Sequence, residues 1–296
     1  MIVVFGSVNL DLIFPLPFLP EPGQTVLGAE LRIEPGGKGA NQAVAAARDG
    51  ARVALAGAVG ADPFAALAQE GLRSANVDLS RVASVAAATG TAAIAVDPEG
   101  RNQIAVAAGA NRLARAAQIE DALLGPATTL LLQMECDPAE TAVLARRARA
   151  RGARIILSLA PPGPLDPDVL AALDFLLVNE DEARWLTKRL DVAADTASLA
   201  ARLGIGVVRT LGAAGVEAAC GGRSIRLPAH AVTVIDTTAA GDCLAGVLAA
   251  ALDRGASLRD ALARAVVAAG LCCTRAGSQR SLPNAAETEA ALRPVR

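Results

Sequence analysis

Two acids enclose a run of small residues between positions 236 and 243, where the sequence reads DTTAAGDC. The β-prone run 231–235 precedes this stretch and the alanine-rich run 244–252 follows it, so we expect a strand that leads into a buried helix. The first N–H groups of a helix lack acceptors and attract an anion. A carboxylate such as Asp242 is out of place beside an anion unless it takes a proton from a reactant, which suggests phosphoryl transfer. An Asp that caps a helix in an ordinary turn is the alternative.

Polar or glycine-rich segments follow several other predicted strands or begin a helix. They are Asn9 and Asp11, the run 36–41 (GGKGAN), Glu135, Asn179 with Glu180, and the run 210–215 (TLGAAG). Ligands of open α/β sheets bind beyond the carboxyl ends of the strands, so we expect these segments to meet at one edge. Taken singly, each segment also has a purely structural explanation. The alternatives are an Asx turn at 9–11, a flexible turn at 36–39, a solvated acid at 135, a helix cap at 179–180 and a tight turn at 210–215.

Strands and helices alternate along most of the chain, which predicts an α/β fold with a mostly parallel central sheet covered by helices on both faces. The expected strands are 1–10, 52–59, 129–133, 154–159, 175–178, 205–210 and 231–235, with a hairpin at 217–219 and 224–227. The expected helices are 40–49, one from 62, 138–151, one from 180, 244–252, 258–273 and one near 285–292.

Two β-rich segments, about 11–35 and 89–108, do not fit this alternation. The first contains the short β-prone pieces 25–27 and 30–33, and the second reads as a hairpin of 91–96 with 103–106. We expect these segments to form a small second sheet over the edge of the first, within a single domain that spans 1–296.

Composition excludes several classes of function. A formal net charge of -2 and an aromatic content of 2% argue against binding of nucleic acid or of an anionic membrane surface. The N-terminus reads as a strand and no long apolar run lacks charge, so we expect no membrane span and a cytoplasmic location. The five cysteines lack metal-ligand spacing and are expected to be reduced thiols. The single histidine, His230, excludes a histidine-based triad, and we assign it and Trp185 structural roles.

Together these motifs resemble those of the ribokinase-like (PfkB) carbohydrate kinases over essentially the whole chain. The matching segments, in family order, are 6–11 (GSVNLD), 36–43 (GGKGANQA), 89–92 (TGTA) with 109–111 (GAN), 178–180 (VNE), 210–212 (TLG), 236–242 (DTTAAGD) and 274–277 (TRAG). The two segments 36–41 and 236–242 are the most specific, and their joint presence disfavours the purely structural explanations for both.

The resemblance implies ATP-dependent transfer of a phosphoryl group to the primary hydroxyl of a small sugar, with D-ribose as the expected acceptor. Asp242 would be the general base, and the backbone N–H groups of Ala239, Ala240, Gly241 and Asp242 would form an anion hole. The implied sugar ligands are Asn9, Asp11, Gly37, Lys38, Asn41, Glu135 and Asp242. The implied nucleotide ligands are Asn179, Thr210, Gly212, Gly215 and Gly241.

Cations and a partner are also implied by the resemblance. Mg²⁺ would accompany the ATP phosphates, and K⁺ would activate the enzyme from beside the anion hole. The positions that match the K⁺ site are Asp236, Thr238, Cys272, Arg275, Gly277 and Ser281, several of them through backbone carbonyls. The small second sheet would close over the sugar as a lid and would form the contact of a homodimer.

The sequence departs from the family pattern at two places. The run 158–161 reads SLAP where the family often has NPAP, and Val266 stands where Asn or His is often found near the adenine, so a polar contact to the base is lost. A kinase of the same family for another sugar, a sugar acid or a nucleoside is an alternative to a ribose kinase. A sugar or nucleotide sensor without catalysis is the alternative from another class.

Overall fold

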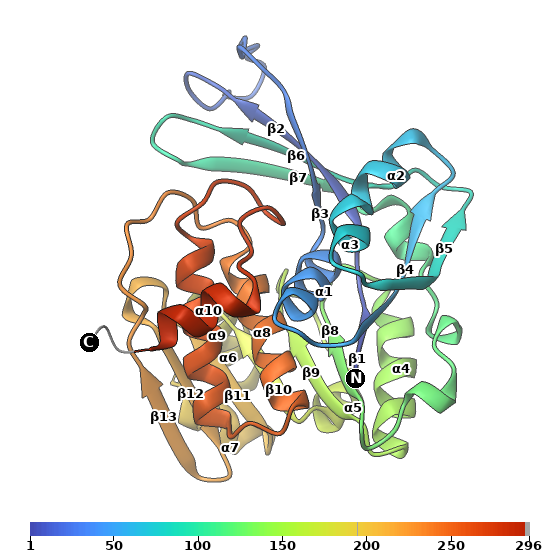
Figure 1. The fold of residues 1–296 in the computed structure, drawn as a ribbon, viewed down its shortest axis with the longest axis vertical. Helices are drawn as coiled ribbons and strands as arrows, with labels where there is room; N and C mark the ends of the chain where they lie inside the picture. The colour runs from blue at the N-terminus through green and yellow to red at the C-terminus, as the bar shows by residue number, and fades with distance from the viewer. Residues whose placement is uncertain (194, 294–296) are drawn as a thin grey trace.

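A large twisted sheet forms the centre of the computed structural model, which describes residues 1–193 and 195–293 (Figure 1). Its nine strands follow the order β13-β12-β11-β10-β9-β8-β1-β4-β5. They are β1 (Ile2–Phe5), β4 (Val53–Gly60), β5 (Asp78–Val85), β8 (Thr129–Leu132), β9 (Arg154–Ser158), β10 (Phe175–Val178), β11 (Gly206–Thr210), β12 (Val216–Cys220) and β13 (Arg223–Leu227). Every neighbouring pair from β11 to β5 is parallel, and only the pairs β11–β12 and β12–β13 are antiparallel. The expected mostly parallel α/β sheet is confirmed.

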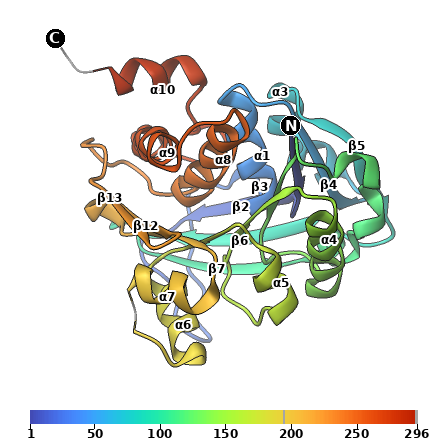
Figure 2. The same ribbon diagram turned by 90° about the horizontal axis from the view of Figure 1, so that it is seen from below.

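Helices cover both faces of the large sheet (Figure 2). One face carries α1 (Lys38–Arg48), α3 (Glu70–Ser74), α8 (Ala240–Asp253) and α9 (Leu258–Cys272), with α10 (Ala285–Leu292) outside α9. The other carries α4 (Pro138–Ala150), α5 (Pro167–Ala172), α6 (Glu180–Leu190) and α7 (Thr196–Leu203). Both faces of the sheet are apolar because successive side chains of a strand point to opposite faces. In β1, Ile2 and Val4 pack in one core, while Val3 and Phe5 pack in the other. Among the described residues, no helix is long and apolar enough to cross a bilayer.

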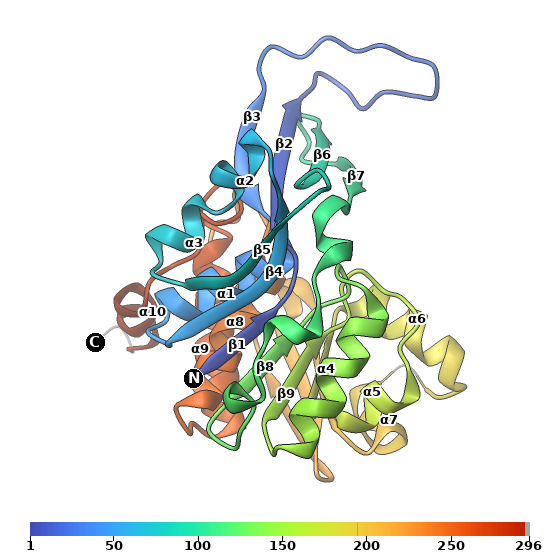
Figure 3. The same cartoon turned by 90° about the vertical axis from the view of Figure 1, so that its right-hand side faces the viewer.

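The small sheet stands beyond the carboxyl ends of the large-sheet strands (Figure 3). It has the order β3-β2-β6-β7, built from β2 (Asn9–Pro15), β3 (Arg32–Gly36), β6 (Gly90–Val96) and β7 (Asn102–Ala107). Strands β2 and β6 are parallel, and the outer pairs are antiparallel. The expected second sheet from about 11–35 and 89–108 is therefore confirmed. The short helix α2 (Pro63–Ala68) packs against its β2 and β3 strands.

Three strand predictions are wrong. The run 231–235 is not a strand, because β13 already ends the sheet and the N–H groups of Ile235 and Asp236 donate to the carbonyl of Cys273 instead. The run 1–10 is not one strand, since the chain leaves the large sheet after Phe5 and enters the small sheet at Asn9. The run 25–27 forms no strand, and its Leu27 is 87% exposed. Strand β5 was not expected, because it is a half-exposed edge strand without an apolar run.

Candidate functional site

Two cavities meet at the N-terminus of α8. The polar cavity, of about 240 Å³, is lined by Lys38, Ser158, Ala160, Leu177, Val178, Asn179, Glu182, Thr210, Thr237, Ala239, Gly241, Asp242 and Leu244. The apolar cavity, of about 500 Å³, is lined by Thr210, Gly212, Ala213, Gly215, Ala229, His230, Ala231, Val232, Val234, Thr237, Ala240, Gly241, Leu244, Val266, Ala269, Gly270 and Cys273. Four residues border both cavities: Thr210, Thr237, Gly241 and Leu244. The first turn of α8 therefore separates a polar site from an apolar one.

The start of α8 places Asp242 as the sequence predicts, in the first turn of the helix. Ala239 caps the helix with φ 59, a left-handed conformation that non-glycine residues rarely adopt. An added Cβ on Gly241 would meet nothing within 4 Å, so the backbone here faces open space. The N–H of Ala240 donates to the carbonyl of Thr237 at 3.2 Å, which leaves the N–H groups of Gly241 and Asp242 available to an anion in that space.

Helix α1 brings its N-terminus against the end of β1. Gly37 has φ 88, and an added Cβ on Gly39 would lie 2.5 Å from the backbone of Gly6 and Ser7. Only glycine permits this approach, which directs Lys38 and Asn41 toward α8. The Asp242 carboxylate is the main cause of a raised pKa for Lys38, and it outweighs the opposing effect of burial. Lys38 therefore stays positively charged beside the anion site.

The residues predicted to hold a sugar gather around a cluster of acids. Burial, followed by the charges of Glu135, Glu34 and Asp242, raises the pKa of Asp11 to about 7. Glu135 accepts a hydrogen bond from the N–H of Lys38 at 3.1 Å and one from the hydroxyl of Ser7. The structure thus brings Asp11, Glu135, Lys38 and Asp242 together, although they lie on four different segments of the chain.

Asn9 is buried and is held by a residue that the sequence motif contains but to which we assigned no role. The Asn111 amide, on the 3₁₀ turn η1 (Gly109–Leu113), donates to Asn9 Oδ1 at 2.7 Å and accepts from the N–H of Val8 at 2.9 Å. Gly90 lies against this pair, since an added Cβ would be 2.2 Å from both amides. Asn111 therefore fixes the amide of Asn9 at the point where the chain enters the small sheet.

The residues predicted to bind a nucleotide divide between the two cavities. Gly212 and Gly215, with φ 52 and 96, border the apolar cavity, and Thr210 borders both. Asn179 borders the polar cavity alone, and its side chain caps α6 by accepting from the N–H of Glu182 at 2.8 Å. The helix-cap explanation of Asn179 is therefore correct for its side chain. His230, which we expected to be purely structural, borders the apolar cavity together with Val266.

Most residues predicted to hold a monovalent cation form one hydrogen-bonded group. Asp236 accepts from Thr238 N at 2.8 Å and from Gly277 N at 2.9 Å, and the Ser281 hydroxyl lies 3.0 Å from Cys272 Sγ. Burial opposes the ionisation of Asp236, but the hydrogen bonds from Thr238 and Gly277 outweigh it and lower its pKa. Arg275 differs, because its side chain pairs with Glu287 on α10. Its carbonyl is the atom left for a cation.

Oxygen donors dominate the places where a cation would bind. The carboxylates of Asp236 and Glu182 and the hydroxyls of Thr238 and Ser281 are hard ligands, which suit K⁺ and Mg²⁺. Residues 1–193 and 195–293 contain no cluster of three or more His, Cys, Asp or Glu that could hold a metal ion. The residues present therefore fit cations that arrive with phosphate or bind backbone carbonyls.

The whole chain matches one known family. The profile of the pfkB family of carbohydrate kinases covers residues 1–285. The chain belongs to this family.

Individual members of the pfkB family match along their full length. Ribokinase of Haemophilus influenzae is 34% identical over 296 residues, which cover 97% of this chain and 96% of that protein. Ribokinase of Bacillus subtilis is 34% identical over 293 residues, covering 98% and 99%. The crystal structure of a ribokinase from Thermotoga maritima superposes with a TM-score of 0.91 at 32% identity and covers 98% of both chains. The Arabidopsis thaliana ribokinase, solved with ribose and ATP, has a TM-score of 0.89 at 29% identity, covering 99% and 98%.

In this pfkB-family chain, sequence reasoning missed three residues at the site. They are Gln42, Asn111 and Glu182. Glu182 borders the polar cavity, and its pKa is raised mainly by burial. Its spacing of three from Asn179 is a capping-box signal that could have identified it. The motif segments 109–111 and 36–43 contain Asn111 and Gln42, but neither segment shows which partner these side chains contact.

Proposed function

We propose that this protein phosphorylates the primary hydroxyl of D-ribose with ATP to give D-ribose 5-phosphate. The observation that carries the proposal is the Asp242 carboxylate in the first turn of α8, where the polar and apolar cavities meet. A sugar held by Asp11, Asn41 and Glu135 would place its hydroxyl at Asp242, beside the polar cavity, and a nucleotide in the apolar cavity would bring its γ-phosphate to the same helix turn. The full-length similarity to ribokinases, one of them solved with ribose and ATP, supports ribose as the acceptor.

Asp242 acts as the general base in this proposal. Its carboxylate takes the proton of the sugar hydroxyl as the oxygen–phosphorus bond forms, and the bond from the γ-phosphorus to the bridging oxygen breaks to release ADP. The N–H groups of Gly241 and Asp242 and the charge of Lys38 stabilise negative charge on the transferred group. Asp11, Asn9, Asn41 and Glu135 orient the sugar hydroxyls through hydrogen bonds.

Two cations complete the proposed site. Mg²⁺ neutralises phosphate charge when bound with ATP, and Glu182 and Asn179, which border the polar cavity, are the residues placed to hold it, directly or through water. K⁺ is assigned to the group around Asp236, Thr238, Gly277 and Ser281, where the carboxylate supplies the charge. Thr210, Gly212 and Gly215 contact the nucleotide.

We also propose a homodimer formed through the small sheet. The outer strands of this sheet expose apolar side chains: Leu31, Ile33, Ile104 and Val106 are between 46% and 56% exposed. Such a patch, on a sheet that stands clear of the core, suits a contact with a second copy. All five cysteines are free, which suits a cytoplasmic location. The molar mass in solution, measured by light scattering, tests the dimer.

A coupled ADP-release assay with Mg-ATP tests the proposed reaction. D-Ribose is compared with 2-deoxyribose, fructose, a keto-deoxy sugar acid and a nucleoside, each in K⁺ and in Na⁺. We expect ribose to be preferred and K⁺ to raise turnover. Activity on a different acceptor would contradict ribose as the substrate but not the mechanism. Binding of sugar without any turnover would contradict the kinase and favour a sensor.

The variant Asp242→Asn tests the general base. Turnover is expected to fall by at least ~10², the usual contribution of a positioned base. Ribose binding, measured by calorimetry, is expected to survive, because Asn keeps the shape of the side chain. Near-normal turnover in Asp242→Asn would contradict the role of Asp242.

A further inference from the structure

The Asp242 carboxylate is held by two amides of helix α1. Asn41 Nδ2 donates to Oδ2 at 3.0 Å, and Gln42 Nε2 donates to Oδ1 at 2.9 Å. Asn41 is one of the predicted sugar ligands, but Gln42 is fully buried and borders neither of the two cavities. Its contact with the base therefore does not depend on a bound sugar.

A second buried amide fixes Gln42 in turn. Gln133, which follows β8, donates from Nε2 to Gln42 Oε1 at 2.7 Å. A carboxylate can only accept hydrogen bonds, so Gln42 must present its NH₂ group to Asp242 and its oxygen to Gln133. Gln133 must then present its own NH₂ group to Gln42. The charge on Asp242 thus determines the direction of both amides.

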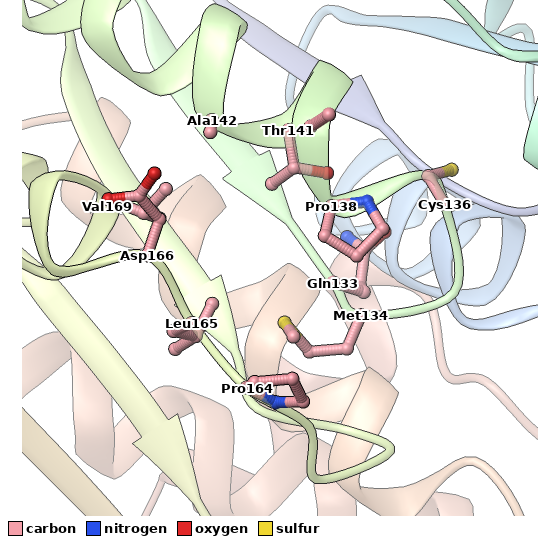
Figure 4. Close-up of a pocket in the computed structure, with 11 residues that line it drawn as sticks. Gln133, Met134, Cys136, Pro138, Thr141, Ala142, Pro164, Leu165, Asp166 and Val169 are labelled. Atoms are coloured by element: carbon pink, nitrogen blue, oxygen red, sulfur yellow. The ribbon is translucent and has the colours of Figure 1, made fainter.

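Gln133 is also one of the residues that line a third cavity, away from the two at α8, although its amide points toward Gln42 and Gly6. This side cavity, of about 160 Å³, lies between the end of β8, α4 and the segment before α5. In Figure 4, Gln133 lies at one side of this cavity, next to Met134 and Pro138, and Asp166 and Val169 lie at the opposite side. Gln133 Oε1 has no hydrogen-bond partner within the described residues and lies where a Cβ on Gly6 would be 2.1 Å away. Among the described residues, the only side-chain hydrogen bond of Gln133 is the one from its Nε2 to Gln42. This bond therefore orients the Gln133 amide.

We propose that Gln42 and Gln133 are positioning residues that hold the Asp242 carboxylate in one plane for proton transfer. The inference rests on the proposed function, since it deepens the role of Asp242. One donor on each oxygen fixes the plane of the carboxylate. The charged and titratable groups that face Asp242 from other elements are Lys38, Asp11, Glu182 and Cys272. Of these, only Lys38 attracts its negative charge.

Kinetics of Gln42→Met test the first link. Methionine keeps the length of glutamine but removes the donor, and a hydrogen bond to a charged group contributes enough for a ~10- to 100-fold fall in kcat. We expect the KM for the sugar to change by less than ~3-fold, so that the loss falls on kcat. A merely structural role would not produce this split between kcat and KM.

Gln133→Met tests the second link without touching Asp242. Methionine keeps the length of glutamine, and Gln133 Oε1 has no hydrogen-bond partner to lose among the described residues, so this variant is expected to fold even if Gln42→Met does not. We expect a ~3- to 10-fold fall in kcat, again with little change in the KM for the sugar. The kcat of the double variant Gln42→Met/Gln133→Met is expected to equal that of Gln42→Met alone, because both substitutions interrupt the same chain of contacts. Additive losses, or unchanged kcat in folded Gln133→Met, would overturn the proposal.

Gln69→Met is the matched control, since Gln69 is also a buried amide but bonds to Ala65 and Arg73 far from α8. Its kinetics should equal those of the wild type. All variants are assayed on whichever acceptor the wild type phosphorylates. A wrong choice of substrate therefore does not count against the relay, by which we mean the contacts from Gln133 through Gln42 to Asp242.

A readout without turnover separates the relay from the reaction itself. In protein labelled with ¹⁵N-glutamine, Asp242→Asn should shift the side-chain NH₂ signals of Gln42 and of Gln133, which does not contact Asp242, and should leave Gln69 unchanged. A Gln133 signal that does not move would refute the relay even in an active enzyme.

Discussion

The polar and apolar cavities lie on either side of the same helix turn, yet they are built in opposite ways. On the polar side, buried side chains hold one another: Asn111 holds Asn9, and Gln42 holds Asp242. On the apolar side, the walls are mostly small aliphatic residues, and the turn at Gly212 and Gly215 is shaped by backbone with positive φ. In the proposed function, the acceptor would therefore be selected by fixed side-chain groups, and the nucleotide would be held by shape and backbone.

Of the substitutions that test this comparison, one at Gly39 should produce the largest effect, because the backbone there has no room for a side chain. In Gly39→Ala the new Cβ would lie 2.5 Å from the backbone of Gly6 and Ser7, so α1 must move away from β1. We expect a loss of about 3 kcal/mol in the free energy of unfolding and a ~100-fold loss in kcat/KM, because α1 carries Lys38 and Asn41.

Gly212→Ala is the matched change on the apolar side. Its Cβ would meet nothing within 4 Å, and only the positive φ of 52 opposes it. The expected cost is about 1 kcal/mol. Urea unfolding and steady-state kinetics are measured for Gly39→Ala and for Gly212→Ala. Equal losses of stability and of kcat/KM in the two variants would contradict the proposed difference between the polar and the apolar side.

Asp11→Asn should give the next largest effect, confined to the polar side. We expect the KM for ribose to rise ~30-fold through loss of charge-assisted hydrogen bonds, with little change in the KM for ATP. Because ionised Asp11 is the better acceptor, the wild-type KM for ribose should fall as pH rises through about 7. An equal rise in both KM values would show that Asp11 acts on the whole fold.

The same variant has a signed effect on stability. The pKa of Asp11 is raised from 3.8 to about 7, so the folded protein keeps a proton that the unfolded chain loses between these pH values. Asp11 therefore lowers the free energy of unfolding as pH rises through this window, by up to about 4 kcal/mol at 1.36 kcal/mol for each pKa unit. Asp11→Asn should unfold at a higher temperature than the wild type at pH 8, and the gap should shrink toward pH 4.

Val266→Asn should give the smallest effect, on the apolar side only. A new amide at the cavity wall can add about one neutral hydrogen bond to the base, which corresponds to a change of ~5-fold or less in the KM for ATP. The ratio of ATP to GTP turnover is the sensitive measurement, and the KM for ribose should not move. A large effect on ribose would show that the two cavities are not separate in function.

Sequence reasoning predicted the α/β sheet, the second sheet and the position of Asp242, because each rests on local pattern. It failed at 231–235, where β propensity is high but β13 already occupies the edge of the sheet. It also missed Gln42 and Asn111, which act through partners about 200 and 100 residues away in the chain. Such pairs depend on how α1, α8 and η1 pack, and no single-sequence pattern encodes that.

The shared wall at Gly241 has a consequence for inhibitor design. A ligand that joins a ribose-like group to an adenosine-like group through a short anionic linker would pass over the first turn of α8, from the side of Asp242 to the apolar cavity. Binding of one half would hold the other at a high effective concentration, so the joined ligand should bind far more tightly than either half alone. The gain requires only that the linker match the span across this one helix turn.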